Sequence, residues 1–314
     1  MGGVDKVDIL LIIFSASTLN LALATATPIA LGSYAGLFSE RSGVVNIAIE
    51  GMMLVGAMSA SMVSAYTGSL FLGVLAGLLS GALMAALHAV LSIRFKMDQI
   101  ISGTVINFLA AGLTGHIYQI YLVPPNWPGS AGTFPDIPIP ILSDIPFIGQ
   151  VLFQHQPVVY VMLILTVVIH LVLFYTPWGL RTRAVGEHPK AADTVGINVY
   201  FMRYANVIIG GMFAGLAGIW LTLEWIDTFT IGMTTGRGFI ALAALIFGRW
   251  TPFGAFGAAL LFGLANAIQI RLQIQNIGID PEFLQMLPYL LTIIVAAIAR
   301  PIPPAAVGRP YEKE

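Results

Sequence analysis

Cysteine is absent from this 314-residue sequence, and only 9% of its residues are charged. The lack of cysteine excludes disulfide bonds, thiol chemistry and cysteine-based metal sites. The five histidines are scattered, with no pair at the i, i+4 spacing of a helical metal site, so no metal centre is expected. A formal net charge of −1 and the lack of a long basic cluster argue against a nucleic acid partner.

Catalytic motifs are also missing. The sequence contains no P-loop of the G-x-x-x-x-G-K-[ST] type and no defensible pairing of a nucleophile with a base. The chain cannot by itself couple ATP hydrolysis to work, so no cofactor is expected on it. An intramembrane enzyme is excluded for the same reason, because paired aspartates and serine–histidine pairs at a plausible depth are lacking.

Hydrophobic residues make up 57% of the sequence, which leaves too little polar surface for a soluble body. Apolar runs long enough to cross a bilayer recur along the chain. We expect an all-α polytopic membrane protein, a single transmembrane domain over residues 1–314 with about eight transmembrane helices. The first apolar run lacks a basic flank and a cleavage site, so we interpret it as a retained helix.

Two segments predict irregular membrane helices. Residues 236–247 hold a short apolar core, FIALAALIF, which indicates a tilted or half-crossing helix. The span at residues 100–122 contains Gly103, Gly112 and Gly115, where it could break. SGVVNIAIEGMMLVGA in the first half and GRGFIALAALIFGRW in the second each place a glycine-containing turn before a short apolar helix. This echo is typical of a weak inverted repeat.

The positive charges predict the orientation. Eleven of the 14 Lys and Arg residues fall on the proposed cytoplasmic side: Arg41, Arg94, Lys96, Arg181, Arg183, Lys190, Arg203, Arg249, Arg300, Arg309 and Lys313. The other three, Lys6, Arg237 and Arg271, fall outside. The bias of Lys and Arg toward the cytoplasm puts the N-terminus outside and the C-terminus inside. Arg237 is interpreted as a charge at the outer face, with a substrate contact as the alternative.

Two loops stand out between the spans. Residues 123–156 have seven prolines and no Lys or Arg, as suits an extracytoplasmic loop held semi-rigid by proline. It could dock a partner outside, or it could anchor the chain at the membrane interface. Residues 177–198, PWGLRTRAVGEHPKAADTVGIN, form a long polar passage with clustered positive charge, which predicts a cytoplasmic loop.

A short helix is predicted inside the cytoplasmic loop. Pro189 suits the first helical position, Ala191 and Ala192 favour helix, and Gly196 suits the C′ stop with a positive φ. A helix of about two turns is marginal alone and needs a partner surface. With Ala191 and Ala192 on its surface, it could sit deep in a groove of another protein.

These motifs carry a resemblance. Ala191-Ala192 followed by Gly196 resembles the EAA loop of ABC-transporter permeases, although Lys190 stands where that motif usually has Glu. SERSGVVNIAIEGMMLVGA at residues 39–57 and GRGFIALAALIFGRWTPFGA at 236–255 resemble the permeases for simple sugars and nucleosides, nucleoside importers most of all. The resemblance implies coupling to an ATPase through Arg183, Glu187, Pro189, Ala191, Ala192 and Gly196.

The resemblance also implies the partners. They are an ABC ATPase with tandem nucleotide-binding domains that uses ATP and magnesium, a second homologous permease, and an extracytoplasmic substrate-binding lipoprotein. The chain itself would lie in the plasma membrane among lipid and form the path of a small polar solute, a nucleoside or simple sugar. A self-contained ion-coupled secondary transporter is the alternative.

Three polar residues within the spans are candidates for the translocation path. Asn46 and Glu50 stand four residues apart, hence on one face of a helix, and an ionisable group in a span is a functional candidate. Glu50 could instead pair with Arg41 or cap a neighbouring helix. Asn107 is the third candidate, with simple interhelical hydrogen bonding as its alternative.

Overall fold

The computed structural model describes residues 15–124, 129–275, 280–298 and 302–313. Within these ranges, seven helices are long and apolar enough to cross a membrane. They are α2 (Ala16–Arg41), α3 (Ile49–Thr67), α4 (Leu70–Ala89) with η1 (Val90–Arg94), α5 (Gln99–Tyr121), α7 (Pro157–Tyr175), α10 (Val199–Trp220) with η2 (Leu221–Trp225), and α12 (Pro252–Ile274). The expectation of an all-α polytopic protein is confirmed.

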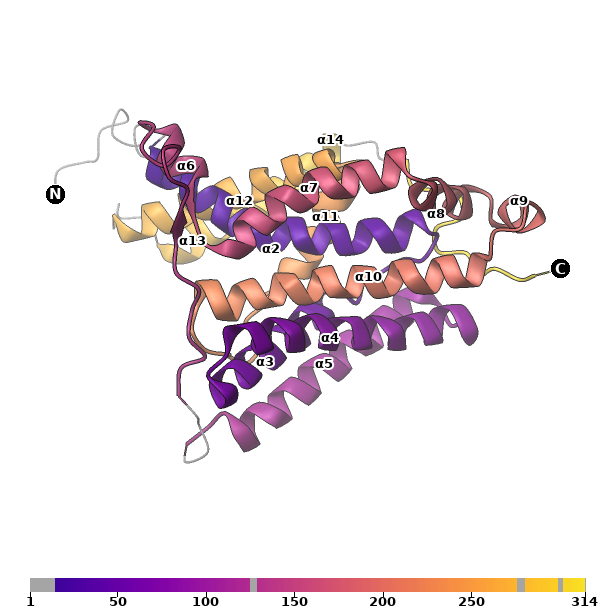
Figure 1. Cartoon of the computed structure of the whole chain (residues 1–314), viewed down its shortest axis with the longest axis horizontal. Helices are drawn as coiled ribbons and strands as arrows, with labels where there is room; N and C mark the ends of the chain where they lie inside the picture. Colours follow the sequence, from indigo (N-terminus) through magenta and orange to yellow (C-terminus); the bar gives the residue numbers. More distant parts are fainter. Residues whose placement is uncertain (1–14, 125–128, 276–279, 299–301, 314) are drawn as a thin grey trace.

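Shorter elements complete the fold. Apolar α11 (Arg237–Phe247) and α14 (Leu287–Ile298) lie among the long helices, with α13 (Pro281–Gln285) leading into α14. At one end of the bundle lie α6 (Ile148–Leu152) and the antiparallel pair β1 (Ile137–Pro138) and β2 (Gln154–His155); at the other lie α8 (Pro177–Glu187) and α9 (Pro189–Thr194) (Figure 1). We call these the α6 end and the α8–α9 end.

Helix starts are set by local sequence. A small polar side chain stands at the N-cap and accepts a hydrogen bond from a backbone N–H in the first turn. Such an N–H has no acceptor within the helix itself. This holds for α2, α4, α5, α8, α10 and α12, capped by Ser15, Ser69, Asp98, Thr176, Asn198 and Thr251. The bounds of the spans therefore follow polar residues that interrupt apolar runs.

Glycine allows the central helices to approach closely. A Cβ on Gly81 of α4 would overlap the carbonyl oxygen of Gly211 on α10, and one on Gly215 would overlap that of Gly77. On the other side of the bundle, a Cβ on Gly263 of α12 would overlap α2, and the backbone of Gly263 accepts a hydrogen bond from Thr25 Oγ1 at 3.0 Å. Small residues at such crossings are the usual means of tight packing in membranes.

The helix pairings of the two halves match one another, as an internal repeat predicts. α4 packs along α10 and α12 packs along α2, while α3 contacts α10 and α11 contacts α2. Each half contains an irregular segment before a helix: residues 42–48 before α3 and residues 226–236 before α11. α11 has 11 residues, about 16 Å of helix, which is half of a membrane thickness. The half-crossing helix is therefore present where the short apolar core predicts it.

The prediction that the span at residues 100–122 breaks is wrong. α5 runs without interruption from Gln99 to Tyr121, and Gly112 and Gly115 face open space instead of a neighbouring backbone. A break in a membrane helix frees backbone N–H and C=O groups that need other partners. Because Gly112 and Gly115 have no such partners nearby, the helix stays intact.

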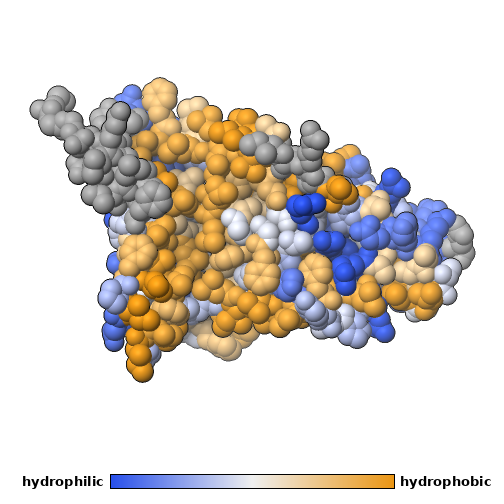
Figure 2. All heavy atoms as spheres, turned by 90° about the horizontal axis from the view of Figure 1, so that it is seen from above, coloured by the Kyte–Doolittle hydropathy of each residue, from blue (hydrophilic) through white to orange (hydrophobic). Residues whose placement is uncertain are grey.

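Polar surface gathers at the α8–α9 end. Figure 2 shows apolar residues over most of one face and hydrophilic residues at the end where α8, α9 and the C-terminal residues lie in Figure 1. Large apolar side chains remain exposed along α4 and α5, among them Leu79, Leu83 and Phe108. Such surface suits lipid or another membrane helix, because water would not cover it favourably.

Candidate functional site

Inside the bundle, Glu50 in the first turn of α3 joins that helix to the start of α11. Its Oε1 accepts a hydrogen bond from the backbone N–H of Gly236 at 2.8 Å, and its Oε2 accepts one from Gly238 at 2.7 Å. The carboxylate thus satisfies free N–H groups at the N-terminus of α11, where the helix dipole favours negative charge. Of the alternatives for Glu50, capping of a neighbouring helix is the one that the structure shows.

Asn107 performs the equivalent task on the other side of α3. Its Oδ1 accepts a hydrogen bond from Gly51 N at 2.8 Å and its Nδ2 donates one to Ile47 O at 3.0 Å. Both backbone groups flank the start of α3, so the amide holds the change from irregular chain to helix against α5. The alternative reading of Asn107, interhelical hydrogen bonding, describes this geometry.

Asn46 requires a correction. α3 begins at Ile49, so Asn46 lies in the irregular segment and does not share a helix face with Glu50. Its side chain is fully buried and donates to Ser39 Oγ at 3.2 Å. The prediction of a shared face failed because it assumed that Asn46 and Glu50 both lie within the helix. We call the arrangement of Glu50, Asn107, the start of α3 and the start of α11 the central junction.

Arg237 is also not where the sequence places it. It stands in the first turn of α11, next to the backbone that Glu50 caps, instead of at the outer end of the bundle. Its Nη1 donates to Met233 O at 3.1 Å and to Thr235 Oγ1 at 2.7 Å. The half-crossing geometry carries this charge inward, which charge counting along the sequence cannot detect.

At the opposite end, the predicted short helix is present as α9. Pro189 occupies its first turn, and Gly196 has φ +84° beyond its end. Gly196 N donates to Asp193 O at 2.9 Å and Ile197 N donates to Ala192 O at 3.0 Å, which is a glycine-dependent stop. The sequence analysis missed α8, whose 11 residues precede α9.

The orientation of α9 corrects a second prediction. Ala192 is only 3% exposed and packs in a small cluster with Val185, Val199, Met202 and Tyr311. Only Ala191 of the alanine pair is exposed. The outward face of α9 and the following turn consist of Lys190, Ala191, Thr194 and Val195. This face, which we call the α9 face, is small and mostly uncharged.

Arg183 and Glu187 lie on α8 behind the α9 face. The guanidinium of Arg183 lies 5.0 Å from the ring centroid of Phe174 on α7, a cation–π contact. Glu187 Oε2 accepts a hydrogen bond from Ala305 N at 3.1 Å. Both side chains therefore attach the loop to the rest of the chain.

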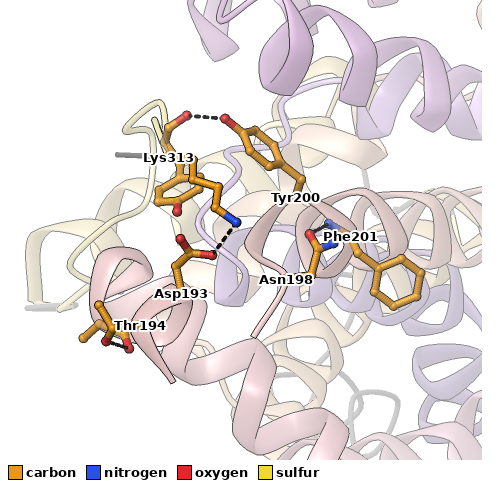
Figure 3. Close-up of polar contacts among 8 residues, drawn as sticks. Asp193, Thr194, Asn198, Tyr200, Phe201 and Lys313 are labelled. Carbon is orange, nitrogen blue, oxygen red and sulfur yellow. Dashed lines mark hydrogen bonds and ion pairs between the residues drawn. The ribbon is translucent and has the colours of Figure 1, made fainter. Parts of the chain in front are cut away.

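The C-terminal segment, residues 302–313, crosses the α8–α9 end and binds the loop. Ala306 N donates to Gly186 O at 2.9 Å, and Tyr200 OH donates to Tyr311 O at 3.4 Å. Lys313 Nζ lies 3.6 Å from Asp193 Oδ1 of α9 (Figure 3). The segment therefore holds α8 and α9 in place from outside the bundle.

The same segment also ties the loop to the other half of the molecule. Arg203 Nη1 of α10 donates to Arg309 O at 3.0 Å, and Gly308 N donates to Gly43 O at 3.2 Å. Lys96, between α4 and α5, pairs with Glu312, and this hydrogen bond lowers the pKa of the exposed Glu312 carboxyl. No sequence signal indicated these contacts, which join residues more than 100 positions apart.

Catalytic and metal chemistry find no support at either place. Among the residues that the structure describes, no group of three or more His, Asp or Glu side chains could hold a metal ion. At the central junction, the carboxylate of Glu50 and the amide of Asn107 form hydrogen bonds with backbone groups. The α8–α9 end presents a helical surface.

Known proteins resemble this chain along most of its length. The model of the family described as branched-chain amino acid transport system permease component matches residues 18–296. The guanosine ABC transporter permease protein NupQ of Bacillus subtilis is 41% identical, over 98% of this chain and 99% of NupQ. The nucleoside ABC transporter permease protein NupC of Lactococcus lactis is 38% identical, over 95% of this chain and 98% of NupC.

One solved structure, an ABC transporter in an inward-facing conformation, matches with a TM-score of 0.50. The match covers 95% of this chain and 91% of that chain at 14% identity, so it bears on the fold alone. It agrees with the helical arrangement described above.

Proposed function

This chain belongs to the family of branched-chain amino acid transport system permease components and is the membrane-spanning permease subunit of an ABC transporter, and we propose that the solute it imports is a nucleoside. The observation that supports nucleosides is identity of 41% and 38% to permeases named for guanosine and for nucleosides, over nearly the whole of each chain. In this family ATP hydrolysis belongs to a separate subunit, in keeping with the lack of a P-loop here.

The ATPase docks on the α9 face in this proposal. Small side chains there leave room for a groove of the partner to close around the helix, and Ala191 stands at the middle of that face. The loop is held on its inner side by Ala192, Glu187 and the C-terminal segment, so a push on α9 reaches α2 and α10. ATP and magnesium act on the ATPase, not on this chain.

The positive charges put the α8–α9 end in the cytoplasm. The α6 end then faces outward, where a substrate-binding lipoprotein would deliver the solute. Here the chain is folded against α2, because Asn20 Nδ2 donates to Gln150 O at 2.7 Å and to Gln154 O at 3.1 Å. A second homologous permease completes the pathway, packed on apolar helix surface of the kind exposed along α4 and α5.

The central junction is the gate in this proposal. Glu50 and Asn107 hold the starts of two helices that enter from opposite ends of the bundle, and breaking either set of hydrogen bonds frees backbone groups in the interior. Irregular backbone at membrane depth is stable only where protein or a polar path covers it. Asn46 supports the same segment from its buried side.

Uptake into proteoliposomes tests the function. The permease is purified with the proposed second permease, ATPase and binding protein, and tritiated guanosine uptake is measured with ATP and magnesium supplied on the ATPase side. The proposal predicts uptake that requires ATP hydrolysis and is unchanged when proton and sodium gradients are collapsed. Uptake driven by an ion gradient without ATP would favour the secondary transporter instead, and ATP-driven uptake of glucose but not guanosine would overturn the nucleoside assignment.

A further inference from the structure

A polar cavity lies beside the central junction, and Arg237, for which the sequence analysis left a substrate contact open, is part of its wall. It is an open pocket of about 250 Å³ between the start of α11, the second half of α12 and the α13–α14 turn, with Gln285 and Tyr289 exposed at its edge. Its polar lining consists of Thr235, Arg237, Asn266, Gln269, Gln285 and Tyr289. Ligand pockets usually measure about 300–1,000 Å³, so this smaller cavity suits one part of a small metabolite and not the whole molecule.

The amides of the cavity have unused hydrogen-bonding capacity. The side chains of Asn266, Gln269 and Gln285 make no hydrogen bond to any other residue in the described part of the chain. Each carboxamide offers two donor hydrogens and an acceptor oxygen. Three such groups around one hollow in a membrane protein require water or a polar solute, because lipid cannot satisfy them.

Arg237 adds a charge to the same wall. Its Nη1 is used by Met233 O and Thr235 Oγ1, while Nε and Nη2 make no hydrogen bond to the described residues. Glu50 attracts this charge electrostatically, but within those residues no carboxylate lies close enough to Arg237 to form an ion pair. A guanidinium carries only donors, so its free edge calls for an acceptor that brings no hydrogen of its own.

We propose that this cavity binds the base of a nucleoside on its way through the permease, with the free edge of Arg237 donating to a base carbonyl and its neighbouring ring nitrogen. The proposal rests on the nucleoside function proposed above. A 6-oxopurine, as in guanosine or inosine, presents such a pair of acceptors, and arginine reads that edge with two parallel hydrogen bonds. Asn266, Gln269 and Gln285 then serve the remaining base edge and the ribose hydroxyls.

The composition of the cavity favours a nucleoside over a simple sugar. Ile240, Pro288 and the ring of Tyr289 complete the lining, which gives a flat base an apolar wall to lie against. A simple sugar has no flat ring to lie against this wall, and each of its hydroxyls carries a hydrogen that the donor-only guanidinium cannot accept. The donor-only guanidinium therefore finds its best partner in a base.

Transport kinetics test the assignment in the full complex with its ATPase and binding protein. Arg237→Gln, Asn266→Ala and Gln285→Ala should each raise the half-saturating concentration for guanosine uptake about tenfold, as expected for loss of a specific polar contact. Gln275→Ala is the matched control, since this exposed amide at the end of α12 lies outside the cavity. Guanosine uptake equal to wild type in all three cavity variants would overturn the proposal.

Because Arg237 also bonds backbone, a second measurement avoids its substitution. The chain has no cysteine, so Asn266→Cys supplies a single thiol for a charged methanethiosulfonate reagent. Guanosine should slow its modification at least fivefold, whereas modification of Gln275→Cys, exposed at the end of α12 and outside the cavity, should not change. Equal modification with and without guanosine would refute the cavity assignment while leaving ATP-driven uptake intact; a wild-type complex that imports no nucleoside would refute both.

Discussion

Glu50 offers the sharpest test of the central junction. Its carboxylate accepts two backbone hydrogen bonds, from Gly236 at 2.8 Å and from Gly238 at 2.7 Å. A hydrogen bond to a charged group contributes about 1.5–3 kcal/mol, so Glu50→Ala should cost at least about 3 kcal/mol of stability. Glu50→Gln keeps one acceptor oxygen and should cost about 1.5 kcal/mol, half as much.

The assay is thermal unfolding of the purified complex, paired with uptake. A loss of 1.5 kcal/mol corresponds to a fall in melting temperature on the order of 5 °C, and Glu50→Ala should fall about twice as far. Glu50→Gln should assemble with the ATPase and yet import poorly, because the start of α11 is then held by one bond. Asp144→Asn, on an exposed carboxylate of the α6 end, is the control.

Two results would refute this reasoning. Melting temperatures for Glu50→Ala and Glu50→Gln equal to that of Asp144→Asn would mean that the carboxylate does not hold α11. Equal melting temperatures for Glu50→Ala and Glu50→Gln would mean that the number of hydrogen bonds does not decide the effect.

Further predictions concern the two ends of the bundle. On the cysteine-free background, Ser130→Cys should react with an impermeant maleimide in intact cells and Thr194→Cys only after permeabilisation; the reverse pattern would invert the topology. Ala192→Trp overpacks the cluster beneath α9, which should cost about 1–3 kcal/mol of stability there and impair uptake while the spans stay folded. Normal uptake together with normal ATPase co-purification would contradict this. Gly196→Val forces a branched side chain to a positive φ, at a cost of about 1–2 kcal/mol, and should loosen α9 in hydrogen exchange, which unchanged protection would disprove. Burial lowers the pKa of His155, so the folded α6 end favours the neutral imidazole and should keep its full hydrogen-exchange protection above about pH 6.5. That protection should fall as the pH falls further, and a His155→Gln variant should lose this pH dependence. Hydrogen-exchange protection that rises on acidification would show the sign to be wrong.

The parts of the fold that were predicted from the sequence depend on local signals. Proline at the start and glycine at the end of α9 act within a few residues, and the short apolar core of α11 limits its length directly. Such features need no knowledge of distant residues.

The parts that were missed depend on distant contacts. Glu50 caps backbone 186 residues away, and residues 42–48 are too apolar to signal that they are not helical. Ala192 faces inward because Tyr311 of the C-terminal segment packs there, a contact that α9 alone does not predict. The cavity beside α11 likewise combines residues from four separate helices, α11, α12, α13 and α14.

Chemical crosslinking from the α9 face measures the central claim most directly. Ala191→Cys, the single cysteine of the chain, is labelled with a short photo-activated crosslinker in the assembled complex. The crosslinked product is then identified by mass spectrometry. Docking at this face predicts a covalent adduct between the permease and the ATPase subunit, absent when Ser130→Cys at the α6 end carries the same reagent. An ATPase adduct from Ser130→Cys, or none from Ala191→Cys in a complex that still imports guanosine with ATP, would contradict the account.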